Sequence, residues 1–370
     1  MQAEELIAAH ITAVRGTWDA EADDVLICRQ VRRETHDVKT FVLEPRTPAL
    51  FRYRPGQFLT FDLEIGGERI NRCYTISSSP ARPHLLSITV KRVPGGPVSN
   101  WLHDTLKPGM QLKAVGPMGE FSCLAHAAPK YLFLSGGSGI TPLMSMARTY
   151  HDLSLPADIV FVHNARTPAD IIFRAELELM ARNLPGFRFV PVCEADATDE
   201  RWTGFAGRIS PAMLKLIAPD LLEREVFTCG PAPYMAAVRK GLGELGYDMA
   251  RYHEESFDFA ALSAEEAVPA LEAEAGLAAE PVAMNYKVEF TKSRKTVECG
   301  ADSFVLNAAR GAGLRLPSSC TEGLCGTCKS RLVSGKVEMR HQGGIRQREI
   351  DQGMVLLCCS KPLTDLVVDR

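Results

Sequence analysis

The stretch Cys320-Thr-Glu-Gly-Leu-Cys325-Gly-Thr-Cys328 places three cysteines at x4 and x2 spacing within nine residues. A further candidate ligand follows in the run Val355-Leu-Leu-Cys358-Cys359. Close spacing lets one loop supply three thiolates to one centre, and Gly323 and Gly326 can take a positive φ there without a Cβ clash. The stretch therefore predicts a metal centre ligated by sulfur.

Two kinds of metal centre use such loops. Structural zinc sites usually carry pairs of ligands at x2–4 spacing, with histidine common in the second pair. Here a triple of cysteines is followed, after a long gap, by a lone ligand, which is the spacing of a [2Fe–2S] cluster. We predict that Cys320, Cys325 and Cys328 hold such a cluster. The fourth ligand is Cys358 or Cys359, because neighbours on a strand point to opposite faces and only one could ligate.

Composition limits the classes of protein that this chain could represent. Its 370 residues predict two or three domains, and 46% hydrophobic residues suffice for ordinary cores. The apolar runs are too short for a membrane span. The N-terminus is acidic where a signal peptide would be basic, so eleven cysteines indicate a reducing cytoplasm and metal or redox use. A net charge of −3 without a basic tract gives no sign of a nucleic-acid partner.

The hydrophobic pattern changes twice along the chain. Short alternating runs punctuated by Gly and Pro predict an antiparallel β-barrel over residues 25–127 after a lead-in at 1–24. From Lys130, apolar strands alternate with helical segments, which predicts a doubly wound α/β domain over 128–257. Residues 258–284 hold ten alanines, six acidic residues and no Lys or Arg, and are predicted to be a linker to a domain at 285–370.

Individual elements are predicted from the same pattern. The predicted strands are Val25–Val31, Thr40–Leu43, Phe58–Phe61, Cys73–Ile76, Leu86–Val90, Tyr131–Leu134, Ile159–His163 and Val226–Cys229. The predicted helices are Ala3–Ala13, Pro142–Tyr150, Ile172–Arg182 and Pro233–Leu245. In the last domain, the pattern predicts a hairpin of two strands, Lys287–Phe290 and Lys295–Cys299, and a helix near Val305–Gly311.

A first binding motif lies in the predicted barrel. Arg72-Cys-Tyr74-Thr75 offers a cation, an aromatic ring and a hydroxyl, which a flavin needs for its phosphate, its ring and its N5 atom. Taken alone, the motif also fits an ordinary surface pair. Downstream, Gly96-Pro-Val-Ser99 starts a helix whose N–H groups would bind a pyrophosphate, with Ser99 as the predicted N-cap. A pyrophosphate favours FAD over FMN.

A second motif lies in the predicted α/β domain. Gly136-Gly-Ser-Gly139-Ile-Thr-Pro142 follows a strand and opens a helix, so a dinucleotide's phosphates could approach backbone amides there. It is not the G-x-G-x-x-G fingerprint. Thr228-Cys229-Gly230-Pro231 ends a later strand. On its own Cys229 would be read as a buried structural thiol.

Four motifs, taken together and in this order, resemble those of the ferredoxin–NADP⁺ reductase superfamily. They are Pro55-Gly-Gln-Phe58, Arg72-x-Tyr-Thr75, Gly96-x-x-Ser99 and Gly137-x-Gly-x-Thr-Pro142. Residues 285–370 resemble plant-type ferredoxins, which implies an α+β β-grasp fold. In ferredoxins the fourth ligand ends a Val-Leu-Leu-Cys run shortly before a proline, which favours Cys358.

The resemblance implies roles for individual residues. Arg72 would meet the flavin phosphate, Tyr74 would stack on the ring, Thr75 would contact N5, and Cys229 would lie beside the nicotinamide carbon that gives up hydride. The residues implied to bind FAD or the nicotinamide nucleotide are Arg72, Cys73, Tyr74, Thr75, Val90, Lys91, Arg92, Gly96, Pro97, Val98, Ser99, Gly137, Ser138, Gly139, Thr141, Pro142, Arg166, Cys229, Gly230, Pro231 and Phe257.

The domain order, flavin then nicotinamide then iron–sulfur, is similar to that of the reductase components of Rieske-type oxygenases. The amino-acid sequence around Arg72 most resembles the reductases of glycine betaine and stachydrine demethylases. The chain is also similar to the NADH oxidoreductase that serves the hybrid-cluster protein. The resemblance implies transfer from NADH through FAD and [2Fe–2S] to a terminal oxygenase, or alternatively to another metalloprotein. The acidic stretch Glu194–Glu200 would repel the 2′-phosphate of NADPH and favours NADH.

The last domain is basic. Residues 285–370 hold fourteen Lys and Arg against nine Asp and Glu, a net charge of +5. Lys329, Arg331 and Lys361 lie close in sequence to the cluster ligands, so we expect them to ring the exposed edge of the cluster as a docking face. The alternative is an ordinary solvated surface.

Overall fold

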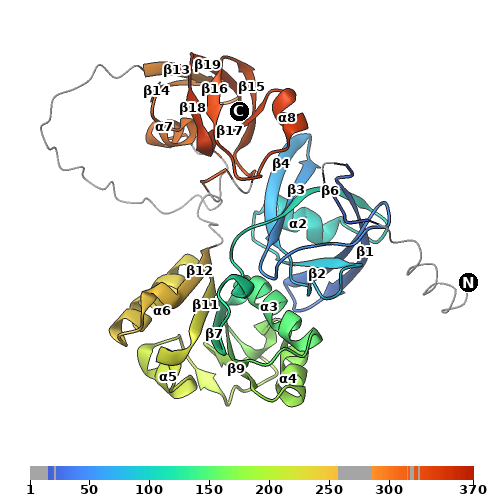
Figure 1. The fold of residues 1–370 in the computed structure, drawn as a ribbon, viewed down its shortest axis with the longest axis vertical. Helices are drawn as coiled ribbons and strands as arrows, with labels where there is room; N and C mark the ends of the chain where they lie inside the picture. Colours follow the sequence, from blue (N-terminus) through green and yellow to red (C-terminus); the bar gives the residue numbers. More distant parts are fainter. Residues whose placement is uncertain (1–15, 21, 257–284, 315, 317–320, 324–325) are drawn as a thin grey trace, which may run out of the picture. The chain divides into compact units, whose positions relative to one another are not determined.

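The computed structural model describes residues 16–20, 22–256, 285–314, 316, 321–323 and 326–370 (Figure 1). The chain divides into two compact units, residues 1–257 and 258–370. The predicted helix at Ala3–Ala13, the linker at 258–284, Phe257, Cys320 and Cys325 lie outside the described residues. No helix in the described ranges is long and apolar enough to cross a membrane.

The first unit begins with a six-stranded antiparallel sheet in the order β4-β3-β6-β1-β2-β5. A bridge between Ile76, just beyond β4, and Ile88 in β5 brings the two ends of this sheet together. Trp18 is buried and packs edge-on against Phe51 with ring centroids 5.4 Å apart, so part of the predicted lead-in belongs to this core. The strands are β1 (Val25–Arg33), β2 (Val38–Pro45), β3 (Phe58–Ile65), β4 (Glu68–Thr75), β5 (Leu86–Lys91) and β6 (Gln111–Met118), and α2 (Pro97–Asp104) follows β5.

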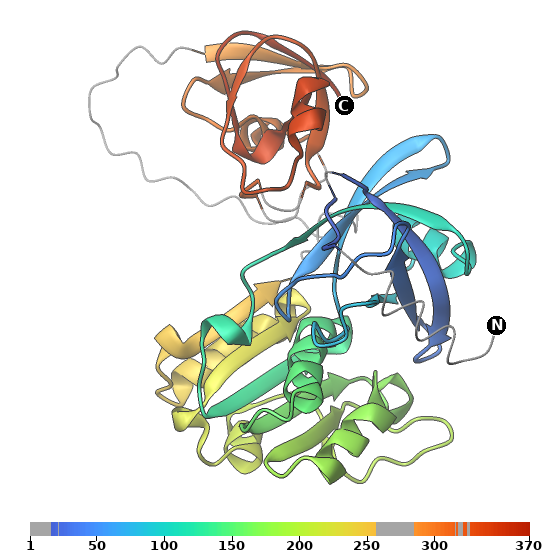
Figure 2. The ribbon, with the colours of Figure 1, turned by 45° about the vertical axis from the view of Figure 1, so that its right-hand side comes forward.

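The second half of this unit is a parallel sheet in the order β10-β9-β8-β7-β11-β12. Helices lie on both of its faces, as Figure 2 shows. Its strands are β7 (Lys130–Gly136), β8 (Asp158–Ala165), β9 (Phe187–Cys193), β10 (Phe205–Ala206), β11 (Glu225–Gly230) and β12 (Tyr252–Ser256). Its helices are α3 (Ile140–Asp152), α4 (Arg174–Asn183), α5 (Pro211–Ile217) and α6 (Ala232–Glu244).

Burial on both faces explains the apolar runs that predicted these strands. In β7, Tyr131 and Phe133 join the core beneath α3, while Leu132 and Leu134 join the core beneath α5 and α6. The chain leaves β7 for β8 on one side and reaches β11 on the other. Ligands of doubly wound folds bind at such a switch point, outside the carboxyl ends of the strands.

The second unit contains a five-stranded mixed sheet in the order β14-β13-β19-β15-β17 and a separate pair, β16-β18. The predicted hairpin and helix are present here. The strands are β13 (Asn285–Phe290), β14 (Lys295–Gly300), β15 (Lys329–Ser334), β16 (Val337–Met339), β17 (Met354–Leu356), β18 (Ser360–Pro362) and β19 (Leu366–Asp369), and the helices are α7 (Val305–Gly311) and α8 (Gln347–Asp351).

The expected place of Lys329 on an exposed docking face is wrong. Its side chain is only 3% exposed, and its Nζ lies 2.8 Å from Glu349 Oε1. Arg346 Nη2 lies 3.1 Å from the same oxygen, so two buried cations share one buried carboxylate. Burial opposes ionisation, but Arg346 and Lys329 outweigh it and lower the pKa of Glu349 to about 2. Arg331, by contrast, is exposed.

We expect Glu349→Ala to destabilise this unit by about 3–5 kcal/mol, because Lys329 and Arg346 would then be buried without a counter-charge. Urea unfolding followed by the visible absorbance of the cluster measures this loss. Glu338→Ala is the matched control, since Glu338 pairs with Arg340 on the exposed surface and such pairs contribute about 0–1 kcal/mol. Because the folded pKa of Glu349 is depressed, its stabilisation is present above pH 4.5 and should fade as the pH falls toward 2. Equal stabilities of the two variants would contradict this assignment.

Candidate functional site

The glycine turn after β7 lies directly against the end of β11. Gly137 has a φ of +52°, which a residue with a side chain seldom adopts. A Cβ on Gly139 would lie 2.3 Å from the carbonyl oxygen of Cys229. Gly139 is also the N-cap of α3, which has no side-chain cap. Helix α3 therefore begins at the switch point, where the positive end of its dipole would favour an anion.

Cys229 and Glu255 lie at the carboxyl ends of neighbouring parallel strands, paired in register. Cys229 is fully buried, and burial followed by the nearby Glu255 carboxylate raises the pKa of its thiol. Burial likewise raises the pKa of Glu255 to about 8. Its Oε2 is shielded from solvent and has no hydrogen-bond partner within the described part of the chain. The sequence analysis missed Glu255, although an acidic residue ending a buried strand was a usable signal.

The predicted flavin residues lie on β4, which borders the sheet. Burial lowers the pKa of Arg72, whose Nη1 donates to the Asn71 carbonyl at 2.8 Å. Thr75 is buried, whereas the ring of Tyr74 is half-buried and lies 6.1 Å from that of Phe61. β4 thus brings the cation, the ring and the hydroxyl together on one strand.

The helix after β5 begins differently from the prediction. Gly96, not Ser99, is the N-cap of α2, with no side-chain cap. Ser99 Oγ accepts from Val93 N–H at 3.1 Å and donates to the Gly96 carbonyl at 3.3 Å, which fixes the turn and leaves the helix amides available. Lys91 pairs with Asp37 at 3.3 Å, and Arg92 with Asp104. The predicted cations of this segment therefore already hold carboxylates.

Helix α3 ties the β4 end of the barrel to the parallel sheet. Ser145 Oγ donates to the Ser78 carbonyl at 2.6 Å, and Arg148 Nη1 donates to the Ser77 carbonyl at 2.5 Å. The buried Arg148 also makes a two-pronged pair with Glu176 and lies 4.6 Å from the centre of the Phe173 ring. Sequence reasoning missed Arg148, because an arginine within an apolar helix carries no motif.

The cysteine region is partly described. Cys328 and Cys358 are both buried, and the Gly323 N–H lies 3.2 Å from Cys358 Sγ. Leu357–Cys359 form a 3₁₀ turn, so the strand argument for choosing between Cys358 and Cys359 does not apply. Cys359 is equally buried, and a Cβ on Gly323 would lie 2.6 Å from its sulfur.

The residues present fit the implied groups. Two helices, α2 and α3, begin without side-chain caps beside glycine turns, which suits phosphate-bearing ligands. The shielded Oε2 of Glu255, without a hydrogen-bond partner in the described part of the chain, lies beside Cys229 at the carboxyl ends of β11 and β12, where it could accept a hydrogen bond from a bound ring. A backbone N–H directed at Cys358 Sγ suits a cluster thiolate.

Comparison with known proteins decides the family. Residues 27–123 match the oxidoreductase FAD-binding domain, 133–240 the oxidoreductase NAD-binding domain, and 288–363 the 2Fe-2S iron-sulfur cluster binding domain. The chain is 49% identical over 354 residues to the glycine betaine monooxygenase reductase subunit of Pseudomonas aeruginosa, covering 95% of this chain and 96% of that one. This chain belongs to the FAD- and NAD-binding reductases that carry a C-terminal [2Fe–2S] domain.

Other relatives agree with this family. The stachydrine N-demethylase reductase subunit of Rhizobium meliloti is 44% identical over 337 residues, covering 91% of this chain and 93% of that one. The structure of phthalate dioxygenase reductase covers 94% of this chain and 97% of its own with a TM-score of 0.55, and at 24% identity it shows the shared fold alone. The comparisons therefore confirm the predicted three-domain fold and the predicted cofactor classes. They also confirm that the chain is an NAD(P)H-dependent flavin and iron–sulfur oxidoreductase, the reductase component of a multicomponent oxygenase.

We expect Gly139→Ala to lower kcat/KM for NADH about tenfold or more, since the added methyl must push the glycine turn away from Cys229. Ferricyanide reduction measures this loss, with flavin content as the check on folding. Gly243→Ala in α6 is the matched control, because nothing lies within 4 Å of its added Cβ. Unchanged NADH kinetics in Gly139→Ala would show that this close approach does not form the nucleotide site.

Proposed function

We propose that this reductase passes electrons from NADH through FAD and the [2Fe–2S] cluster to a Rieske-type oxygenase that demethylates a quaternary amine such as glycine betaine. The observation that carries the proposal is the 49% identity to a glycine betaine monooxygenase reductase subunit, which extends through all three domains. The 44% identity to a stachydrine demethylase reductase supports the same class of small methylated ammonium substrates for the partner.

The proposed roles follow from the positions of the side chains. Arg72 supplies the charge for a flavin phosphate, while Tyr74 and Thr75 present a ring and a hydroxyl to the isoalloxazine. Cys229 stays a neutral thiol at the switch point, because burial raises its pKa, and it orients the nicotinamide by packing. The bound flavin supplies the conversion of one hydride into two single-electron transfers. Cys320, Cys325, Cys328 and Cys358 are the proposed ligands of the cluster.

Preference for NADH rests on the loop after β9. Its backbone lies beside Arg166, since Ala195 N–H donates to the Arg166 carbonyl at 2.9 Å. Glu194 pairs with Arg208 at 3.6 Å, and Glu200 binds Arg174 at 2.7 Å. These carboxylates engage cations that a 2′-phosphate would need and repel the phosphate itself.

We therefore expect kcat/KM for NADH to exceed that for NADPH about tenfold or more. Steady-state ferricyanide reduction with each nucleotide measures the ratio. The double variant Glu194→Gln, Glu200→Gln should lower this ratio, because it should raise kcat/KM for NADPH and leave kcat/KM for NADH unchanged. Equal kcat/KM values for NADH and NADPH in the unaltered protein would contradict the preference for NADH. They would not contradict the proposed transfer of electrons through FAD and the cluster to the oxygenase.

The electron route can be tested with the oxygenase component of a glycine betaine monooxygenase. We expect this reductase to support NADH-dependent release of formaldehyde from glycine betaine. Cys358→Ser should lose the cluster and this transfer but retain ferricyanide reduction, because the flavin can reduce ferricyanide directly. Cys359→Ser is the matched control and should keep both activities and the cluster.

Two outcomes would contradict the proposal in different ways. A cluster lost from Cys359→Ser but kept in Cys358→Ser would reverse the ligand assignment. Ready reduction of a hybrid-cluster protein, with no turnover of the oxygenase, would replace the proposed partner. The eleven cysteines suit metal and redox use in a reducing compartment, and we place the protein in the cytoplasm on this basis.

A further inference from the structure

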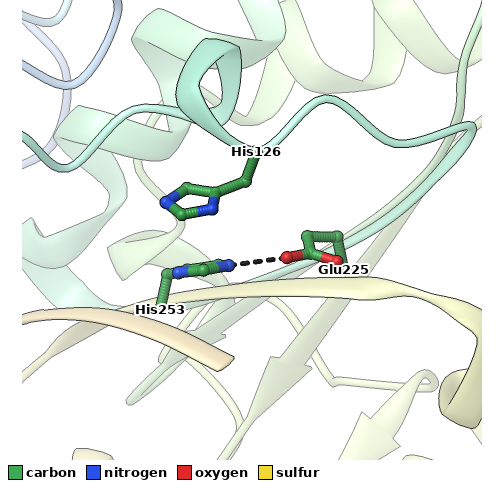
Figure 3. A group of neighbouring side chains, drawn as sticks. All are labelled: His126, Glu225 and His253. Atoms are coloured by element: carbon green, nitrogen blue, oxygen red, sulfur yellow. Dashed lines mark hydrogen bonds and ion pairs between the residues drawn. The ribbon is translucent and has the colours of Figure 1, made fainter. Parts of the chain in front are cut away.

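Three side chains able to bind a metal ion meet at the edge of the parallel sheet opposite the nucleotide site. His126 follows a short 3₁₀ turn in the connection from the barrel to β7, Glu225 is the first residue of β11, and His253 lies in β12. Figure 3 shows the two imidazoles one above the other, with Glu225 beside the lower ring. None of these residues belongs to the flavin, nicotinamide or cluster sites.

Their donor atoms are close enough to share one ion. One ligand atom from each residue lies within 4.8 Å of the others, and His253 Nε2 lies 2.6 Å from Glu225 Oε1. Around a tetrahedral zinc ion with bonds of about 2.0–2.1 Å, donor atoms are about 3.3 Å apart. The distance between His253 Nε2 and Glu225 Oε1 is shorter than this value, and the donor atom of His126 lies no more than 4.8 Å from either, so the His126 ring must turn to complete the set.

Neighbouring residues hold Glu225 and His253 in place, whereas the ring of His126 is exposed. This ring must turn out of its stack with His253 to bind an ion, because imidazole lone pairs lie in the ring plane and those of stacked rings do not converge on one ion. The imidazoles stack with centroids 3.7 Å apart, and His253 stacks on Phe227 at 4.7 Å. The ring of His126 has no hydrogen-bond partner among the residues that the structure describes, so its nitrogens are available. Arg251 Nε donates to Glu225 Oε2 at 3.1 Å, which turns the other carboxylate oxygen toward His253. Hydrogen bonds of this kind orient ligating carboxylates in metal sites.

A second group, His36, Asp37 and Asp170, also has donor atoms within 4.8 Å of one another. Its carboxylates are already engaged. Asp37 pairs with Lys91 and accepts from Thr35, and Asp170 accepts from the hydroxyl of Thr167 at 2.7 Å. This group also offers only one imidazole, whereas two imidazoles suit zinc better than two carboxylates do.

We propose that His126, Glu225 and His253 form a Zn²⁺ site, with an open fourth position for water. Two imidazoles and a carboxylate are a ligand set that zinc accepts in proteins. The ion would cross-link three segments of the first unit: the connection from the barrel to β7, the first residue of β11, and β12. It would therefore stabilise the first unit without touching the nucleotide edge, because Glu225 and Gly230 are the two ends of β11.

Equilibrium dialysis of the chelator-treated holoenzyme against micromolar Zn²⁺, followed by elemental analysis, tests the proposal. We expect one zinc ion per chain. His126→Ala and His253→Ala should each weaken binding about tenfold or more, while His36→Ala, the matched control from the other cluster, should not. Zinc should raise the thermal midpoint of the unaltered protein but not that of His126→Ala. NADH–ferricyanide activity should be the same in all these variants.

X-ray absorption at the zinc edge separates this site from the cysteine loop. The proposed site requires a first shell of nitrogen and oxygen at about 2.0–2.1 Å, whereas zinc on cysteines would show sulfur at about 2.3 Å. A sulfur shell, zinc retained in both His126→Ala and His253→Ala, loss of zinc in His36→Ala, or no binding at micromolar zinc would each overturn the proposal. Because His126 is exposed, its replacement should not impair folding, and flavin content verifies this.

Discussion

The arrangement of the first unit depends on the hydrogen bonds from α3 to the chain leaving β4. Arg148 and Ser145 donate to the carbonyls of Ser77 and Ser78, the residues that follow the flavin strand. Arg148 is buried, so its charge must be compensated, and the two-pronged pair with Glu176 does this. Its guanidinium also lies over Phe173, which has a positive φ of 59° at the start of α4. A buried cation thereby joins two helices and the end of a barrel strand.

The same helix begins at the nucleotide turn. Gly139 caps α3, and thirteen residues at 1.5 Å each make a rod of about 20 Å. One end of this rod lies against the carbonyl of Cys229, and its middle bonds to Ser77 and Ser78, just beyond the strand that carries Tyr74 and Thr75. Electron transfer from a nicotinamide to a flavin requires the two rings to approach in a fixed geometry. Helix α3 begins at the glycine turn and bonds to the chain leaving β4, so it is placed to hold these two segments in a fixed relation.

The sequence allowed some elements to be predicted and hid others for physical reasons. Strand β7 was predicted because both of its faces are buried, which gives a continuous apolar run. Strand β6 was not predicted, since Lys113, Gly116 and Pro117 interrupt its pattern. Lys329 was placed on the surface because it follows a cluster ligand, yet Glu349, twenty residues later, makes its burial possible. Pairings of this kind between distant residues have no local signal.

The candidate sites show the same division. Glycine turns at helix starts could be predicted because backbone geometry restricts the residue type, and Gly139 has space for no other side chain. The N-cap predicted at Ser99 lies three positions after the observed N-cap, Gly96, because a serine can cap a helix from the N-cap or brace the turn from the third helical residue. His126 and His253 are 127 residues apart and carry no motif. Only the pairing of β11 with β12 brings His253 to Glu225.

The parallel sheet explains how one strand can serve two chemically separate sites. In β11, Glu225 lies at the amino edge, where Arg251 compensates its charge and His253 lies within hydrogen-bond distance, and Cys229 and Gly230 reach the carboxyl edge. Strand β11 pairs with β7 on one side and with β12 on the other, so it is an interior strand of the sheet. A ligand at the amino edge therefore stabilises the position of β11 without entering the space where the nucleotide binds. The connection that contains His126 runs from the barrel into β7, so the amino edge is also where the barrel and the sheet are covalently joined.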